Sequence, residues 1–480
     1  MPDGTGSMTA LLRDPRPHLG IGRPRRLVAV LGIVVALTGV ALAVAVATRL
    51  DQQLNALAVA ASLLILLLSL RWPLIALFAY VILVPIEEAV VIPGLGSLSR
   101  YAAIMFIITY GIPRLGRLTI GAMPAAGWGY VAWAAFSATW AIDSSESWTQ
   151  IPVVLLLFAV ATLIASVVVE RPSVVRPLLW TYSVSAAVTA TIGVLAYIAG
   201  GGPLGPEDRI AAIQNQNPAY YAAILLPALI FALHELFHGR AVLLSGVIAL
   251  VCTAAIIASG TRGAWVAVAV VFWLFLLPRL HPARRLAALA IILFIGLVTL
   301  QLPGISTMIQ ERADIALSSG GSGRTDIWSV GLRIFGSAPV TGVGLGNFPT
   351  AFTPERVRDT SVTITDPATL TGRAPHNIVI GTLGELGLVG IVLLAMLLVP
   401  LLVRPGWGPD GTAVQAALAA LLVLALFLDV LNRKEVWLLI GIACGLAYLD
   451  RQPAVRFAWR PRLSLRRRAG ARSPARESTA

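Results

Sequence analysis

Cysteine, clustered histidine and clustered acidic residues are scarce in this sequence. It has two cysteines, Cys252 and Cys444, and each lies within an apolar run. A cysteine in such a run packs as a small hydrophobic side chain, and two isolated cysteines give neither a disulfide framework nor a zinc-site spacing. No Asp-rich or His-cluster metal motif occurs in the segments that we predict below to face outward. The sequence therefore predicts no redox chemistry, no metal site and no cofactor.

Charged residues are also few. They make up 12% of the 480 residues, whereas 57% of residues are hydrophobic and the mean hydropathy is +0.84. Many apolar runs reach about 18 residues, the length at which a helix begins to span the hydrocarbon core of a bilayer. This composition excludes a soluble domain and predicts an all-α polytopic membrane protein.

Hydropathy along the chain predicts about 12–14 transmembrane helices. The candidate spans lie at 27–48, 53–70, 73–91, 98–112, 121–139, 149–168, 174–199, 217–236, 240–259, 262–278, 284–303, 376–402, 413–430 and 435–450. The run at 27–48 exceeds the h-region of a signal peptide, which has about 7–15 residues, so we interpret it as an uncleaved first span.

These spans predict five parts of the chain. They are a basic tail (1–26), a bundle of about 11 spans (27–303), a large loop rich in Gly, Ser, Thr and Pro (304–375), about three C-terminal spans (376–450) and a second basic tail (451–480).

The orientation follows from the basic residues. The net charge of +13 comes from 36 basic residues, of which Lys434 is the only lysine. Short cytoplasmic segments carry an excess of Arg and Lys, and both tails are rich in arginine, so both termini are predicted to be cytoplasmic. Alternating the loops then places two thirds of the basic residues inside and residues 304–375 outside. We expect a multi-pass protein of the cytoplasmic membrane whose tails contact anionic lipid, with no nucleic acid as partner.

Four arginines at predicted outer membrane edges are not explained by this rule. They are Arg209 in "GPEDRIAAIQNQNP", Arg262 in "ASGTRGAW", Arg324 in "GGSGRTDIW" and Arg373 just before a His-Asn pair. A single such arginine often only anchors a helix end or pairs with a nearby carboxylate, as Asp326 would pair with Arg324. Several on one surface favour a phosphate or diphosphate ligand, because a guanidinium binds phosphate oxygens in a bidentate manner.

His376 is the only histidine that this topology places outside. It stands where an apolar helix begins, and the free amides and dipole of a helix start depress the pKa of an imidazole. A neutral imidazole can act as a general base. The alternative is a histidine that merely caps the helix, with Asn377 as a hydrogen-bonding neighbour and Pro375 as a fixed entry residue. The other histidines, His18, His234, His238 and His281, are predicted to be cytoplasmic without a specific role.

Three motifs in order, "SGTRGAW", "GRTDIWSVGLRIFGSAPVTGVGLGNF" and "HNIVIGTLGELGLVG", resemble the O-antigen ligase and O-antigen polymerase superfamily of bacterial membrane glycosyltransferases. The resemblance covers about 259–402, and upstream it rests on topology and "RIAAIQNQNP". It implies a GT-C-like fold and a glycan donor on undecaprenyl diphosphate, which reacts without a metal at the outer face of the cytoplasmic membrane. The chain departs from the family in its higher span count and its long basic tails.

The resemblance also implies site residues. Arg262 and Arg324 would bind the diphosphate, with Arg209 beside them, and His376 would be the base that activates a hydroxyl of a glycan or lipid acceptor. Asn377, Arg373 and Glu385 are expected to support the site.

Two further features come from the sequence itself. Glu385 lies nine residues beyond His376, about 13 Å deeper in a helix, where an ionisable group is a functional candidate. Glycines at 384, 387 and 390 predict a small helix face for close packing. The run "GVGLGNF" at 342–348 lacks the preceding strand of a dinucleotide-binding motif, so it predicts a turn in which glycine allows close backbone approach.

Two other classes of protein fit part of the sequence. A membrane transporter or exporter of a polar or anionic solute would also use many spans and a buried Glu385, but it should have polar features at mid-membrane in two matching halves, and no repeat is visible. A membrane scaffold with basic tails would leave His376 and the outer arginines unexplained. Motifs this sparse do not distinguish a ligase from a polymerase, and they do not identify the sugar or the acceptor.

Overall fold

The structure is a computed structural model of the 480-residue chain. It describes residues 65, 67–87, 91–92, 96–199, 217–301, 306, 309–310, 324–357, 373–403 and 408–452. Both tails, the predicted first span at 27–48 and Arg209 lie outside the described residues.

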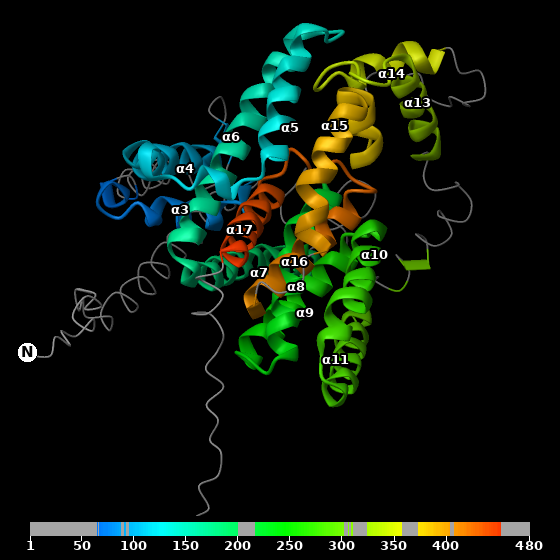
Figure 1. Ribbon diagram of the computed structural model, residues 1–480. Helices are drawn as coiled ribbons and strands as arrows, with labels where there is room; N and C mark the ends of the chain where they lie inside the picture. The colour runs from blue at the N-terminus through cyan, green and yellow to red at the C-terminus, as the bar shows by residue number, and fades with distance from the viewer. Residues whose placement is uncertain are drawn as a thin grey trace, which may run out of the picture.

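The described chain is almost entirely helical (Figure 1). Its α-helices are α3 (Leu74–Leu83), α4 (Leu98–Phe106), α5 (Ala125–Phe136), α6 (Ser144–Glu170), α7 (Val175–Ala199), α8 (Pro218–Phe237), α9 (Val242–Ala258), α10 (Arg262–Val271), α11 (Pro282–Leu300), α13 (Arg324–Ser337), α14 (Phe348–Val357), α15 (Ile378–Val403), α16 (Gly408–Leu424) and α17 (Lys434–Arg451). Helix α10 continues through a π-helical turn, Phe272–Leu276, and a 3-10 turn, Leu277–Arg279.

Six helical segments of the described chain are long and apolar enough to cross a membrane. They are Ser144–Glu170, Pro172–Ala199, Pro218–Phe237, Arg262–Arg279, Pro282–Leu300 and Ile378–Val403. Three shorter apolar helices accompany them, Leu74–Leu83, Val242–Ala258 and Asp410–Leu424. The prediction of a helical, polytopic membrane protein is confirmed. The total of 12–14 spans stays a prediction, because part of the apolar sequence lies outside the described residues.

The predicted span at 73–91 is wrong in its second half. Helix α3 ends at Leu83, two residues before Pro85, which has no N–H to donate to a continuing helix. Beyond it, β1 (Val91–Ile92) pairs antiparallel with β2 (Gly96–Ser97). This short ribbon departs from the all-α expectation, and it precedes α4 directly.

Side-chain caps fix where several helices begin. Asp143 accepts hydrogen bonds from the backbone N–H groups of Ser145 and Glu146 at the start of α6. Asn217 accepts from the N–H of Ala219, and Pro218 occupies the first position of α8. Proline is favoured there because the first N–H of a helix has no partner within the helix. These caps determine the residues at which α6 and α8 begin.

The core contains a close contact between α6 and α17. A Cβ atom added to Gly441 would lie 2.6 Å from the carbonyl oxygen of Ala161, and one added to Gly445 would lie 2.7 Å from Cβ of Val168. Two glycines four residues apart let helix backbones approach within a membrane. Helix α17 is thereby held against α6, and its first residues are fixed beside the pocket described below.

Part of the predicted outer loop forms a small helical unit. Helices α13 and α14 pack together around a hydrophobic cluster of their own and against the first turns of α15 (Figure 1). The buried members of this cluster are Ile327, Val330, Ile334, Val343, Phe348, Ala351 and Phe352. Phe348 also lies against Gly384 of α15, where an added Cβ atom would come within 2.9 Å of the ring.

Candidate active site

His376 has a strained backbone. Its φ angle is 47°, in the left-handed region that residues other than glycine rarely adopt. The imidazole is partly buried and lies directly after the buried Pro375. A backbone of this kind costs about 1–3 kcal/mol and is found most often at functional sites.

Asn377 caps helix α15, and His376 does not. The Oδ1 atom of Asn377 accepts the backbone N–H groups of Val379 at 2.8 Å and Ile380 at 3.1 Å. Its Nδ2 atom donates to the carbonyl oxygen of Leu426 at 3.1 Å. The interpretation of His376 as a helix cap is therefore wrong, because that position is filled by its neighbour. Asn377 was expected to support the site, and its observed contribution is to cap the helix that follows His376.

The environment of His376 is positively charged. Burial, followed by the nearby charges of Arg324 and Arg373, lowers the pKa of His376 below its ordinary value. The sequence predicted this direction from the helix dipole, whereas the causes in the structure are burial and the two guanidinium groups. The ring is therefore neutral at physiological pH, the form that a base requires.

Arg324 and Arg262 are also close enough to influence each other. Arg324 is the first residue of α13 and Arg262 the first residue of α10, and each side chain is partly buried. Burial and the charge of Arg262 lower the pKa of Arg324. The described residues contain no ion pair between Arg324 and Asp326, so the expected local pairing is wrong. The charges of Arg324 and Arg373 thus act on His376, and the charge of Arg262 acts on Arg324.

Helix starts lie near these charged side chains. Arg262 and Arg324 are the first residues of α10 and α13, and the positive end of a helix dipole favours anions. At the start of α15, by contrast, the N–H groups of Val379 and Ile380 are bound by Asn377 and that of Ile378 by the carbonyl oxygen of Ala425. The first N–H groups of α15 are therefore not available to a ligand.

Helix α15 is broken at Gly387. This glycine has φ 65° and ψ −162°, which no helical residue adopts. The break lies within an apolar helix, where free backbone groups need protein partners. Close packing at these glycines was predicted, and Gly384 and Gly387 do lie against Phe348 and the backbone of Val340, where an added Cβ would come within 2.9 Å and 2.3 Å. Gly387 does so at a break in the helix and not on a regular helix face.

The loop 338–346 supplies those partners. The N–H groups of Val343 and Gly344 donate to the carbonyl oxygens of Gly384 and Glu385, each at 2.9 Å. On the other side of the break, the N–H of Leu388 donates to the carbonyl oxygen of Pro339 at 2.9 Å. The break and the loop form one hydrogen-bonded unit.

Glycine is required in this loop. Gly342, Gly344 and Gly346 all have positive φ angles, of 68°, 102° and 77°. A Cβ atom at Gly342 would lie 2.3 Å from the carbonyl carbon of Glu385, closer than atoms can approach. The interpretation of "GVGLGNF" as a turn with close backbone approach is confirmed. Asn347 then holds this turn to the start of α6, accepting the N–H of Asp143 at 2.6 Å.

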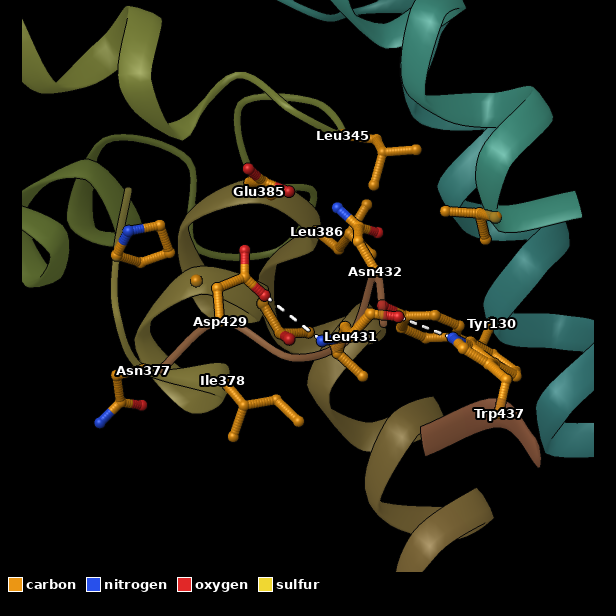
Figure 2. A pocket seen from close by; sticks show the side chains of 14 residues that line it. Tyr130, Leu345, Asn377, Ile378, Glu385, Leu386, Asp429, Leu431, Asn432 and Trp437 are labelled. Atoms are coloured by element: carbon orange, nitrogen blue, oxygen red, sulfur yellow. Dashed lines mark hydrogen bonds between the residues drawn. The ribbon is translucent and has the colours of Figure 1, made fainter. Parts of the chain in front are cut away.

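A narrow pocket lies beside the cap of α15 (Figure 2). Its polar lining includes Asn377, Glu385, Asp429 and Asn432, and its aromatic lining Tyr130 and Trp437. Figure 2 shows the carboxyl groups of Glu385 and Asp429 on the same side of this space. Carboxylates, amides and aromatic rings together suit a molecule that carries many hydroxyl groups.

Sequence reasoning found Glu385 and Asn377 but missed four other residues of this pocket, Tyr130, Asp429, Asn432 and Trp437. Asp429 carried a signal, because it is an acidic residue at the end of an apolar run. The predicted span at 413–430 placed Asp429 inside a helix, whereas α16 ends earlier, at Leu424. Tyr130 and Trp437 lie far apart in sequence, and packing of α5, α15 and α17 brings them to one pocket.

Comparison with protein-family models matches residues 247–395 to the O-antigen ligase family. This part of the chain is similar to that family. The match agrees with the segment 259–402 on which the motif resemblance rested, and it confirms that resemblance. A search of curated proteins found no match.

Most of the candidate site residues lie within the segment that matches the O-antigen ligase family. Arg262, Arg324, Arg373, His376 and Glu385 all fall within residues 247–395, whereas Asp429 lies beyond them. The match indicates a glycan-transferring enzyme of the O-antigen ligase or polymerase type, without deciding between the two. Within the described ranges no three His, Cys, Asp or Glu side chains gather as a metal site, and metal independence remains a prediction.

Proposed function

We propose that this protein transfers or polymerises glycan from an undecaprenyl-diphosphate-linked donor at the outer face of the cytoplasmic membrane, without a metal. The observation that carries the proposal is His376 itself, which is partly buried, has a left-handed backbone and feels the positive charges of Arg324 and Arg373, while Arg262 acts on Arg324. The family match at 247–395 supports glycan transfer in general. The lipid carrier, the absence of a metal and the orientation are the parts that we propose.

In the reaction, an acceptor hydroxyl attacks the anomeric carbon of the donor sugar. The new glycosidic bond forms as the bond from that carbon to the diphosphate oxygen breaks, and the lipid diphosphate leaves with the electron pair. His376 takes the proton of the hydroxyl, as a neutral imidazole can. Arg262 and Arg324 stabilise the charge that develops on the diphosphate, a role in which preorganised donors are effective.

We assign the acceptor to the pocket beside the cap of α15. Its rim includes Pro375 and Asn377, the neighbours of His376, and its interior includes Glu385 and Asp429. A sugar held by these carboxylates would present a hydroxyl toward His376 while the donor diphosphate contacts the arginines. Positioning of this kind supplies a large share of the rate of a two-substrate reaction.

The purified full-length protein provides the direct test. A fluorescent lipid-linked oligosaccharide and an acceptor are mixed with wild-type protein, with the His376→Ala variant and with an Arg285→Ala control at the opposite end of the bundle. In the presence of a chelator, we expect transfer by the wild type and the control, and transfer slower by about 10²–10⁴-fold by His376→Ala. Wild-type protein that transfers no glycan from any lipid diphosphate would refute the proposal.

The glycans of a strain that lacks the protein separate the two reaction types. A lost ladder with a single repeat retained identifies a polymerase, whereas accumulation of lipid-linked polymer identifies a ligase. Unchanged glycans would contradict both.

One observation favours the transporter alternative. Discontinuous helices are a feature of secondary transporters, and α15 is discontinuous at Gly387. The groups freed by this break, however, bind the loop 338–346 and do not face an open path. Flux of a polar or anionic solute in proteoliposomes, at an unchanged rate in the His376→Ala variant, would favour the transporter.

A further inference from the structure

A second pocket lies at the opposite end of the bundle from His376. It is lined by residues at the end of α8, after α10 and near the start of α16. Arg262 begins the segment that ends at Arg279, and the helical rise over that length separates the two ends by about 25 Å. The second pocket therefore cannot belong to the site of glycan transfer.

This pocket has a cationic side and an apolar side. Its polar lining consists of His234, His238, Arg240, Arg279 and Thr412. The remaining lining residues are Phe237, Phe275, Leu276 and Leu280. A lining of this type suits an anionic group attached to a less polar body.

The positive charges around the pocket exceed the carboxylates that pair with them. Arg240 and Arg176 both form ion pairs with the buried Glu235, so two cations share one carboxylate. Arg279 donates to the carbonyl oxygen of Phe275 and to Oε1 of Gln415, which are neutral groups. A third positive charge therefore lies at the pocket without a carboxylate bound to it.

His234 adds an unsatisfied donor. Its side chain lines the pocket and is 2% exposed, and its Nε2 atom has no hydrogen-bond partner among the described residues. Its ring contacts that of His238 in a tilted arrangement, with centroids 4.2 Å apart. Buried polar atoms nearly always have a partner, and an exception in a cationic pocket points to a ligand.

We infer that this second pocket binds a phosphate group, either free or carried by the headgroup of an anionic phospholipid. Arg240 and Arg279 provide charged donors, and the unpartnered Nε2 atom of His234 provides a third donor in the tautomer that carries its proton there. Arginine is suited to phosphate because its planar fork contacts two oxygens at once. The inference does not depend on the proposed glycan transfer, since the two sites lie at opposite ends.

The test uses the purified full-length protein and measures its midpoint of thermal unfolding. In one arm, inorganic phosphate is titrated into detergent-solubilised protein against chloride at equal ionic strength. In the other arm, nanodiscs of phosphatidylglycerol are compared with nanodiscs of phosphatidylcholine. A response to phosphate alone identifies the free anion, and a response to phosphatidylglycerol identifies the lipid headgroup.

Three variants remove the proposed donors, namely Arg240→Gln, Arg279→Gln and His234→Phe. Arg176→Gln is the matched control for Arg240→Gln, because it also removes an ion pair to Glu235 but does not line the pocket. We expect each donor variant to weaken the response about 10- to 100-fold in apparent affinity, the range for a lost hydrogen bond to a charged group. The control should keep the wild-type affinity even if its midpoint falls.

Two outcomes would overturn the inference. One is wild-type protein that responds to neither phosphate nor phosphatidylglycerol. The other is a response that persists at full affinity in Arg240→Gln, Arg279→Gln and His234→Phe. Size-exclusion chromatography and retained glycan transfer in these variants exclude misfolding as the cause of a lost response, because none of the three residues lies at the transfer site.

Discussion

Asn377 accepts the backbone N–H of Val379 at 2.8 Å and so caps α15, which leaves the adjacent His376 outside the hydrogen bonding of the helix. The two residues therefore have separable roles. Losing a cap destabilises a protein by about 1 kcal/mol, whereas losing a general base slows a reaction by about 10²–10⁴-fold.

The first prediction contrasts His376→Ala with Asn377→Ala. We expect His376→Ala to lower kcat by about 10²–10⁴-fold with little loss of stability, because no helix bond depends on the imidazole. Asn377→Ala should lower the free energy of unfolding by about 1–2 kcal/mol. Single-turnover transfer assays and thermal unfolding of both variants measure the two effects. A His376→Ala enzyme within a few-fold of the wild-type rate would assign the base elsewhere, with Glu385 as the next candidate.

The second prediction concerns pH. Because burial, Arg324 and Arg373 hold the pKa of His376 below its ordinary value of about 6.5, the ring stays neutral at pH 7 and above. The rate should be constant there and should fall as the pH drops through this lowered pKa. Arg373→Gln removes one positive charge, so the acid limb of kcat/KM should move to higher pH. An acid limb that stays in place in Arg373→Gln, as it should in an Arg285→Gln control, would contradict this account.

The third prediction concerns the phosphate contacts. Arg262→Lys and Arg324→Lys keep the charge but lose bidentate binding, so each should lose about 2–3 kcal/mol of transition-state stabilisation. The measurement is kcat/KM for the lipid-linked donor. Arg285→Lys, at the far end of the bundle, serves as the control. Near-normal activity in both site variants would show that these arginines only anchor helix ends at the membrane edge and do not bind phosphate.

The fourth prediction concerns the loop that closes the break in α15. Gly342→Ala would bring a Cβ atom to 2.3 Å from the carbonyl carbon of Glu385 and would also strain a φ angle of 68°. We expect a loss of about 3 kcal/mol or more in stability and a loss of transfer. Gly336→Ala is the matched control, since a Cβ there meets nothing within 4 Å. Its effect should be neutral or stabilising by about 0.5–1 kcal/mol.

The fifth prediction concerns orientation. Cysteine introduced at the exposed Ser329 of α13 should react with an impermeant thiol reagent in intact cells, and cysteine at the exposed Ala283 should react only after lysis. The two native cysteines are buried and should give little background. The reverse pattern of labelling would invert the topology and, with it, the proposed location of the transfer reaction.

Hydropathy and residue type predicted much of this molecule. The start of α8 after Asn217 lies within one residue of the predicted span at 217–236, and a short polar side chain before an apolar run explains it. Helix α6 begins five residues before the predicted span at 149–168, because Asp143 caps a polar first turn that hydropathy alone does not include. The assignment of Arg262, Arg324 and His376 to one outer site came from topology and stays a prediction.

Two features were beyond a single sequence. The run containing Gly387 reads as one apolar span apart from Glu385, so its hydropathy does not locate a break at Gly387, and the backbone groups freed there bind a loop some 40 residues earlier. The pocket depends on how α5, α15 and α17 pack, which brings Tyr130 and Trp437 to the same space. Contacts between distant segments are set by tertiary packing and not by local pattern.

The bonds between the loop 338–346 and residues 384–388 also limit how members of such a family can be recombined. Chimeras are usually designed by exchanging an outer loop between its two flanking spans. Here such an exchange would leave the carbonyl oxygens of Gly384 and Glu385 facing a foreign backbone inside the apolar layer. A chimera should therefore fold only if both segments come from the same parent, so the loop and the first turns of α15 have to be exchanged together although a stretch of sequence separates them.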